Sequence, residues 1–90
     1  MKKVEIYTKN YCPYCKRAME LLRIKGVDFI EYDVTHDKTK EEEMRSRSGR
    51  HTVPEIFVDG QLIGGCSDLF DLDEKHALDA VLDLKKGDSE

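Results

Sequence analysis

The chain of 90 residues has no tryptophan, two prolines and three cysteines. It has no apolar run near the ~18 residues that a membrane-spanning helix needs, so no transmembrane segment is expected. The N-terminal sequence MKKVEIYT lacks the apolar stretch of a secretory signal, and we expect a cytoplasmic protein. Small secreted domains held by disulfides usually have more cysteines, in even number. A disulfide framework is therefore not expected.

The composition predicts one globular domain. Hydrophobic residues make up 39% and charged residues 38% of the chain, which is unlike a disordered protein. We expect a domain at 1–84 and a frayed tail at 85–90. The net charge of −4 argues against nucleic acid as the main partner. Residues 1–25 carry seven Lys and Arg against two Glu, a basic region that would attract an anionic small substrate. Scattered surface charge is the alternative.

Two strands with a helix between them are predicted near the N-terminus. Polar and apolar residues alternate over residues 3–8 and again over 27–34, which is the pattern of half-buried strands. Pro13 suits the first position of a helix and Gly26 suits its end. Between them, four residues share the spacing of one buried helix face: Cys15, Ala18, Met19 and Leu22. This order predicts a right-handed parallel crossover.

The rest of the chain predicts further helices around a hairpin. Residues 37–48 have the composition of an exposed helix with little apolar surface besides Met44. Residues 55–58 and 61–64 predict two short strands joined by a tight Asp-Gly turn. From Ser67 onward, recurring leucines and valines predict one or two covering helices. The order β-α-β-α-β-β-α predicts an α/β fold with a mixed four-stranded sheet and helices on both faces.

Two of the three cysteines, Cys12 and Cys15, are three positions apart at the expected start of the first helix. The free N–H groups of a helix N-terminus carry partial positive charge and stabilise a thiolate, the nucleophilic form of cysteine. Cys15 lies one turn further in, on the buried face, so it could resolve a disulfide that Cys12 forms. The alternatives are half of a zinc site, completed by Cys66 or histidines, and a chance spacing of inert cysteines.

Three motifs stand in order along the chain: CPYC at 12–15, TVP at 52–54 and GGCSD at 64–68. With them, the chain resembles the small bacterial dithiol glutaredoxins of the thioredoxin-fold superfamily, from about residue 2 to residue 84. The resemblance implies a thioredoxin-like fold and a glutathione-dependent enzyme that reduces glutathione mixed disulfides and protein disulfides through its cysteine pair. A redoxin served by thioredoxin reductase is the alternative within the fold, although such proteins usually lack the third motif.

The resemblance implies that the TVP motif forms one wall of a glutathione site. The family has a cis peptide before this proline, which turns the backbone N–H and C=O of Val53 toward the cysteinyl part of glutathione. Thr52 and Pro54 belong to the same wall, and Tyr14, between the cysteines, would pack against the ligand. An ordinary strand-initiating proline and a surface tyrosine are the alternatives.

The GGCSD motif implies the opposite wall. Gly65 lets the backbone come close to a ligand. The N–H groups of Cys66, Ser67 and Asp68 begin a helix and would bind the γ-glutamyl carboxylate, while Asp68 would accept a hydrogen bond from the ammonium group. A plain helix cap is the alternative for Ser67 or Asp68. We expect Cys66 to be a small buried packing residue, and its oxidation as a regulatory route stays open.

The glycine carboxylate of glutathione needs a cation. Lys9 is the candidate that matches the family, and Arg47 and Arg50 are the other candidates. Tyr11 departs from the threonine or serine that the family often has before the first cysteine. His51 precedes the TVP motif, and we expect a solvated loop residue rather than a general base.

The resemblance implies glutathione as co-substrate, with no metal and no tightly bound cofactor. The partners would be proteins that carry a disulfide or a bound glutathione, with ribonucleotide reductase among the family's known substrates. Glutathione reductase would act indirectly. We expect a monomer with neither nucleic acid nor a membrane as partner. The alternatives are an iron–sulfur or zinc carrier that uses Cys12 as a ligand, which Cys15 and Pro13 disfavour, and a non-catalytic interaction module.

Overall fold

The structure is a computed structural model that describes residues 2–82. The expected order of elements is confirmed, and the C-terminal helical region is split into two helices. The elements are β1 (Val4–Thr8), α1 (Pro13–Ile24), β2 (Ile30–Asp33), α2 (Lys38–Ser48), β3 (Glu55–Val58), β4 (Gln61–Gly64), α3 (Cys66–Glu74) and α4 (Leu78–Val81). The expected domain end at 84 and the expected tail at 85–90 lie outside the described residues.

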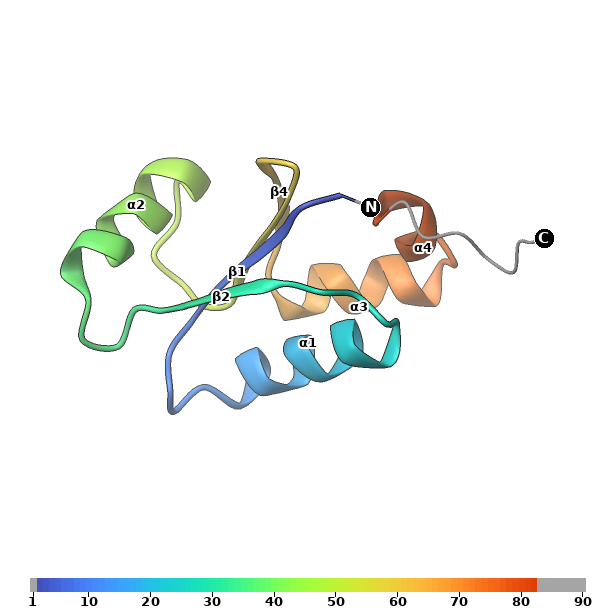
Figure 1. Ribbon diagram of the computed structural model, residues 1–90, viewed down its shortest axis with the longest axis horizontal. Coiled ribbons are helices and arrows are strands. Elements are labelled where there is room, and N and C mark those ends of the chain that lie inside the picture. Colours follow the sequence, from blue (N-terminus) through green and yellow to red (C-terminus); the bar gives the residue numbers. More distant parts are fainter. Residues whose placement is uncertain (1, 83–90) are drawn as a thin grey trace.

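The four strands form one mixed sheet in the order β2-β1-β3-β4. β1 pairs with β2 in parallel and with β3 in antiparallel orientation, and β3 and β4 form an antiparallel hairpin. α1 and α3 lie on one side of this sheet and α2 lies on the other (Figure 1). The predicted α/β fold of the thioredoxin type, with helices on both faces, is therefore confirmed.

α1 ends in a way that shortens the next strand. Its C-cap is Lys25, and Gly26 follows at φ 74°, a left-handed conformation that favours glycine. The N–H of Gly26 bonds to the Arg23 carbonyl, and the N–H of Val27 bonds to the Leu22 carbonyl, which is a Schellman ending. The expected strand start at residue 27 is therefore wrong. The N–H of Val27 serves the helix, and β2 begins only at Ile30.

The two faces of the sheet bury different sets of residues, because successive side chains of a strand point to opposite faces. The face under α1 and α3 carries the larger apolar core, with these members among others: Val4, Ile6, Ala18, Leu22, Ile56 and Leu69. The face under α2 carries a smaller cluster: Tyr7, Val34, Met44 and Phe57. Met44 is the one residue that α2 buries, as the sequence predicts.

Helix caps and a tight turn define two of the remaining connections. Asp37 caps α2 by accepting the N–H of Lys40 at 3.0 Å, and Gly49 ends the helix at φ 72°. Asp59 and Gly60 both have positive φ, 50° and 81°, which is the turn that suits a two-residue hairpin.

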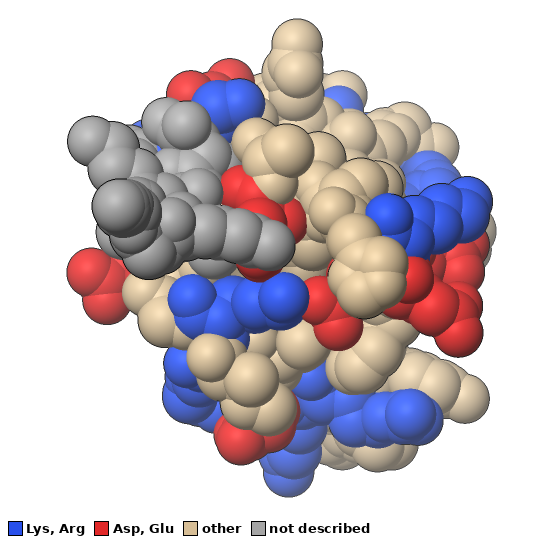
Figure 2. Space-filling view, turned by 90° about the vertical axis from the view of Figure 1, so that its right-hand side faces the viewer, with Lys and Arg blue, Asp and Glu red and all other residues tan. Residues whose placement is uncertain are grey.

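The surface of the described part carries charge of both signs. On the face that Figure 2 shows, Lys and Arg side chains lie among Asp and Glu side chains, so charge is scattered there. Within residues 2–82, no helix has both the length and the apolar composition needed to cross a bilayer.

Candidate active site

Cys12 and Cys15 lie at the first turn of α1. Cys12 is the N-cap, and its Sγ accepts the backbone N–H of Cys15 at 3.2 Å. The Cys12 thiol also lies 3.8 Å from the carbonyl oxygen of Val53, to which it donates. Both cysteines are free thiols, 8% exposed for Cys12 and fully buried for Cys15. Cys12 is thus the more accessible sulfur of the pair.

The surroundings of the two sulfurs differ. Burial, followed by the hydrogen bond with Cys12, raises the pKa of Cys15 to about 12, so Cys15 remains a thiol at neutral pH. Cys12 instead has a helix N–H directed at its sulfur, and the first turn of α1 contains no acidic residue. A helix N–H directed at the sulfur is typical of reactive cysteines. The pair therefore offers one sulfur that can attack and one that can resolve.

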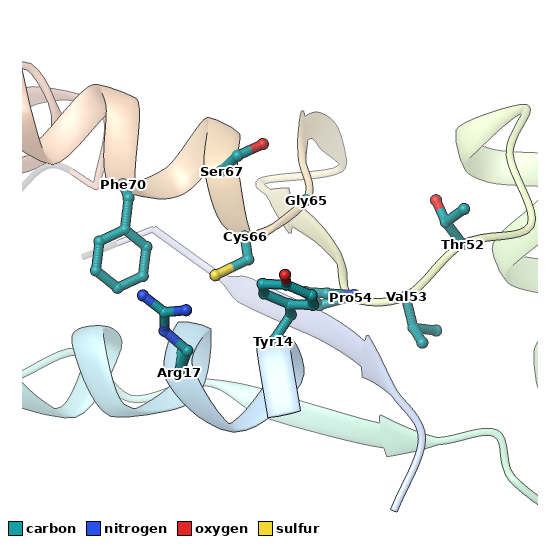
Figure 3. Close-up of a pocket in the computed structure, with 9 residues that line it drawn as sticks. All are labelled: Tyr14, Arg17, Thr52, Val53, Pro54, Gly65, Cys66, Ser67 and Phe70. Carbon is teal, nitrogen blue, oxygen red and sulfur yellow. The ribbon is translucent and has the colours of Figure 1, made fainter. Parts of the chain in front are cut away.

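A groove of about 520 Å³ lies beside the cysteine pair, within the usual size range of small-molecule sites. Seven of the nine residues that the sequence predicts for glutathione line it. The lining residues are Tyr14, Arg17, Thr52, Val53, Pro54, Gly65, Cys66, Ser67 and Phe70 (Figure 3). The peptide bond between Val53 and Pro54 is cis, as the resemblance implies. The TVP and GGCSD motifs, twelve residues apart in the chain, thus form two walls of one groove.

Asp68 closes the N-terminal end of α3. Its carboxylate accepts the N–H of Gly65, the N-cap, at 2.9 Å. A Cβ atom on Gly64, which has φ 128°, would collide with that carboxylate, so this position needs glycine. Asp68 lies outside the groove lining and its side chain is 51% exposed. It therefore acts as a helix cap in the free protein, and a ligand role would come in addition.

The candidate cations Lys9 and Arg47 have different surroundings. The Lys9 ammonium lies 3.5 Å from the Glu41 carboxylate of α2. Arg47 lies over the other face of the sheet and donates to both carboxylate oxygens of the buried Glu5, at 3.0 and 3.3 Å. Its guanidinium also stacks 4.1 Å from the centre of the Phe57 ring. Arg47 therefore holds α2 to the sheet, which leaves Lys9 and Arg50 as candidates.

Arg50 is bound to a carboxylate that the sequence analysis missed. Glu55 is fully buried and accepts two hydrogen bonds from Arg50, at 2.8 and 3.1 Å, and one from the Thr52 hydroxyl at 2.8 Å. The same guanidinium lies 4.0 Å from Asp68. Glu55 thus ties the segment before the TVP motif to β3. The available signal was a charged residue directly after that motif, inside a strand.

Arg17 and Phe70 are the groove residues that the sequence analysis missed. The Arg17 guanidinium lies 5.9 Å from the Tyr14 ring centre and 5.8 Å from that of Phe70, so it bridges α1 and α3 at one end of the groove (Figure 3). Arg17 follows Tyr14 by three positions and Phe70 follows Ser67 by three. Helical spacing places each on the same helix face as a motif residue, but the packing of α3 beside α1 is what brings both to the groove.

The other predicted residues lie as follows. Cys66 lines the groove at 9% exposure, and its burial raises the pKa of its thiol. His51 is exposed in the loop before β3, and Tyr11 is exposed before the cysteine pair. Among residues 2–82, no three His, Cys, Asp or Glu side chains are grouped so that they could hold a metal ion.

Comparisons with known proteins agree with this geometry. The family model described as Glutaredoxin matches residues 4–63. Glutaredoxin 3 of Escherichia coli strain K12 is 56% identical over 82 residues, which are 91% of this chain and 99% of that protein.

Solved structures show the same likeness. The solution structure of a glutaredoxin from Brucella melitensis has a TM-score of 0.81 at 44% identity, covering 96% of this chain and 94% of that one. The crystal structure of a buckwheat glutaredoxin–glutathione complex has a TM-score of 0.82, covering 91% and 77%. Its identity is 24%, so this second likeness concerns the fold alone.

Proposed function

The chain belongs to the glutaredoxin family and is a glutathione-dependent thiol–disulfide oxidoreductase, and we propose that Cys12 is its nucleophile and Cys15 its resolving cysteine. One observation carries this assignment. The Cys12 sulfur lies at the N-cap of α1, beside the groove, and accepts a helix N–H at 3.2 Å. A helix N–H in this position is typical of cysteines that attack disulfides. Cys15 is fully buried, whereas Cys12 is partly exposed, so a substrate meets Cys12 first.

Glutathione mixed disulfides need Cys12 alone. The Cys12 thiolate attacks the glutathione sulfur of the mixed disulfide, that S–S bond breaks, and the substrate leaves as a thiolate that takes up a proton. The thiolate of a second glutathione then attacks the glutathione sulfur bound to Cys12. Oxidised glutathione leaves and the Cys12 thiolate is restored. The net reaction oxidises one free glutathione, which leaves joined to the glutathione of the mixed disulfide, and reduces the substrate sulfur to a thiol.

Protein disulfides need both cysteines. The Cys12 thiolate attacks one substrate sulfur and forms a mixed disulfide with the protein. Cys15 loses its proton and attacks the Cys12 sulfur, which releases the reduced substrate and leaves a Cys12–Cys15 disulfide. Two glutathione molecules then reduce that disulfide and leave as oxidised glutathione. Because burial holds the pKa of Cys15 at about 12, Cys15 attacks a disulfide already formed rather than a free substrate.

The groove supports one orientation of glutathione. The cysteinyl part pairs with the backbone of Val53, whose carbonyl lies 3.8 Å from the Cys12 sulfur. The γ-glutamyl carboxylate binds the N–H groups of Cys66 and Ser67 at the start of α3, and Asp68 takes its ammonium group. The glycine carboxylate forms an ion pair with the Lys9 ammonium group. Thr52, Pro54, Gly65 and Tyr14 complete the contact surface, and no tightly bound cofactor is required.

The proposed setting is a reducing cytoplasm, in which glutathione reductase regenerates reduced glutathione. The small and odd number of cysteines supports that setting. The partners we propose are glutathionylated and disulfide-containing proteins, ribonucleotide reductase among them. We propose that the protein acts on them as a monomer.

The test measures reduction of the mixed disulfide of glutathione and 2-mercaptoethanol, coupled to glutathione reductase and NADPH. Wild type and Cys15→Ser should be active, whereas Cys12→Ser should fall to the uncatalysed rate because it has no nucleophile. A Cys12→Ser variant that retained activity would refute the assignment of Cys12. A wild type inactive with glutathione but reduced by thioredoxin reductase would move the electron donor to that enzyme.

A further inference from the structure

The side chain of Lys9 is held between the active site and α2. The Lys9 carbonyl accepts the N–H of Cys12 at 3.2 Å, which fixes the Lys9 backbone next to the cysteine pair. Its ammonium group lies 3.5 Å from the carboxylate of Glu41 in the first turn of α2. Both side chains are about three-quarters buried, 23% and 25% exposed. Lys9 thus has a carboxylate partner before any ligand binds.

Glu41 is itself held in this place. Its carboxylate also lies 3.8 Å from the Arg45 guanidinium, one helical turn further along α2. The first turn of a helix favours an acidic side chain, because its free N–H groups carry partial positive charge. The low exposure of Glu41, its position in the first turn and the Arg45 guanidinium all favour its place beside Lys9.

We propose that Glu41 limits the affinity for glutathione by competing with the glycine carboxylate for Lys9. This inference rests on the proposed function, in which Lys9 binds that carboxylate. Two carboxylates beside one ammonium group repel each other, so binding must displace Glu41 or share Lys9 with it. The competition concerns only ligands that carry a negative charge at the glycine end. Glu41 thus lowers the preference for glutathione over related thiols that lack a carboxylate at the glycine end.

The main test replaces Glu41 with glutamine, which keeps the side-chain shape and removes its charge. The substrates are the mixed disulfide of 2-mercaptoethanol with glutathione and the same compound with the glycine carboxylate as its ethyl ester. Glu41→Gln should raise kcat/KM for the acid by about two- to fivefold, the range of a partly exposed ion pair, through a lower KM. It should leave kcat/KM for the ester unchanged, because the ester has no carboxylate there.

Two matched variants complete the design. Glu42→Gln makes the same change of charge at an exposed neighbour in α2, and it should leave both substrates unchanged. In a Lys9→Gln background, adding Glu41→Gln should no longer help the acid, because the shared cation is gone. A gain that persisted without Lys9 would reflect general charge rather than competition and would overturn the inference.

The outcomes separate this inference from the site assignment beneath it. If wild type reduces the acid and the ester equally well, then no cation binds the glycine carboxylate, and both the role of Lys9 and the inference are wrong. If wild type prefers the acid, and Lys9→Gln removes the preference while Glu41→Gln behaves like Glu42→Gln, then only the inference is wrong. Activity of Cys12 with glutathione would stand in both cases.

Discussion

The two faces of the sheet are covered by helices that are held in different ways. Under α1 and α3 the contacts are apolar, and Ile6 and Leu22 have no exposed surface. α2 itself buries one apolar side chain, Met44, and a hydrogen-bonded cluster around Glu5 and Arg47 adds to this contact. Tyr32 also donates to Glu5, at 2.8 Å.

The difference matches what each helix carries. α1 carries the cysteine pair, and non-directional apolar packing over a large area holds it against the sheet. α2 carries Glu41 toward Lys9, and its attachment depends on a few directional contacts and on the charge of one buried carboxylate. Truncation of an apolar side chain should therefore damage the first face most. Removal of a charge, or a change of pH, should damage the second face.

The largest effect is expected at the centre of the apolar face. Leu22→Ala should lower the free energy of unfolding by about 2–5 kcal/mol, since it removes a fully buried side chain and leaves a cavity between α1 and the sheet. Urea unfolding of the reduced protein would measure the loss.

Ile24→Ala is the matched control for this variant, because Ile24 lies on the same helix and is 71% exposed. It should change the free energy of unfolding by about 0.5 kcal/mol or less. Equal losses in Leu22→Ala and Ile24→Ala would mean that apolar packing does not hold α1 in the way described.

A smaller loss is expected at the centre of the polar cluster. Arg47→Met keeps an apolar stem but leaves the Glu5 carboxylate, 6% exposed, without its guanidinium partner, so that the exposed Lys3 ammonium at 3.8 Å is its remaining cation among the described residues. We expect a loss of about 2 kcal/mol, below the ~3–5 kcal/mol of a fully buried pair because Arg47 is 27% exposed. Urea unfolding would again measure the loss.

Two further variants test the cause of that loss. Arg45→Met changes an exposed arginine of the same helix and should cost about 0.5 kcal/mol or less. Glu5→Gln should restore part of the stability in the Arg47→Met background, because an unpaired buried amide costs less than an unpaired buried carboxylate. If Arg47→Met cost no more than Arg45→Met, the polar cluster would not be what holds α2.

The same contrast explains which parts of the fold could be predicted from sequence. Local patterns predict α1 and the Asp-Gly hairpin, because the helical spacing of buried residues and the turn residues each lie within a short stretch of the sequence. The start of β2 could not be predicted, since the N–H of Val27 is used by the end of α1. The pair of Glu5 and Arg47, 42 positions apart, has no local signature.

The candidate site divides in a similar way. The role of the cysteine pair could be predicted from the chemistry of a helix N-terminus. The groove walls could be predicted because their motifs resemble those of a known family. Glu55 and Arg17 were missed because each depends on another segment. Glu55 is buried only because Arg50 and Thr52 bind it, and Arg17 reaches the groove only because α3 packs beside α1. Such residues become visible once the tertiary contacts are known.

The smallest effect we predict is a difference in how the two faces respond to acid. The hydrogen bond from Arg47 lowers the pKa of Glu5 despite burial, helped by the Tyr32 hydroxyl and by the Lys3 ammonium 3.8 Å away. With a pKa lower in the folded state, Glu5 stabilises the protein above its unfolded pKa, and this stabilisation is lost as pH falls through the folded value. Acid should thus weaken the attachment of α2.

Urea unfolding of wild type and Arg47→Met, at steps from about pH 7 to about pH 4, would test this difference in acid response. In Arg47→Met, protonation of Glu5 removes a buried charge that has lost its guanidinium partner, so the stability gap between the two proteins should narrow as pH falls. The gap between wild type and Leu22→Ala should stay constant over the same steps, because Leu22 interacts with no titrating group through charge. A gap for Arg47→Met that is equally constant would mean that Glu5 is not ionised beside Arg47. The two faces would then differ in how their side chains pack rather than in the charges that hold them.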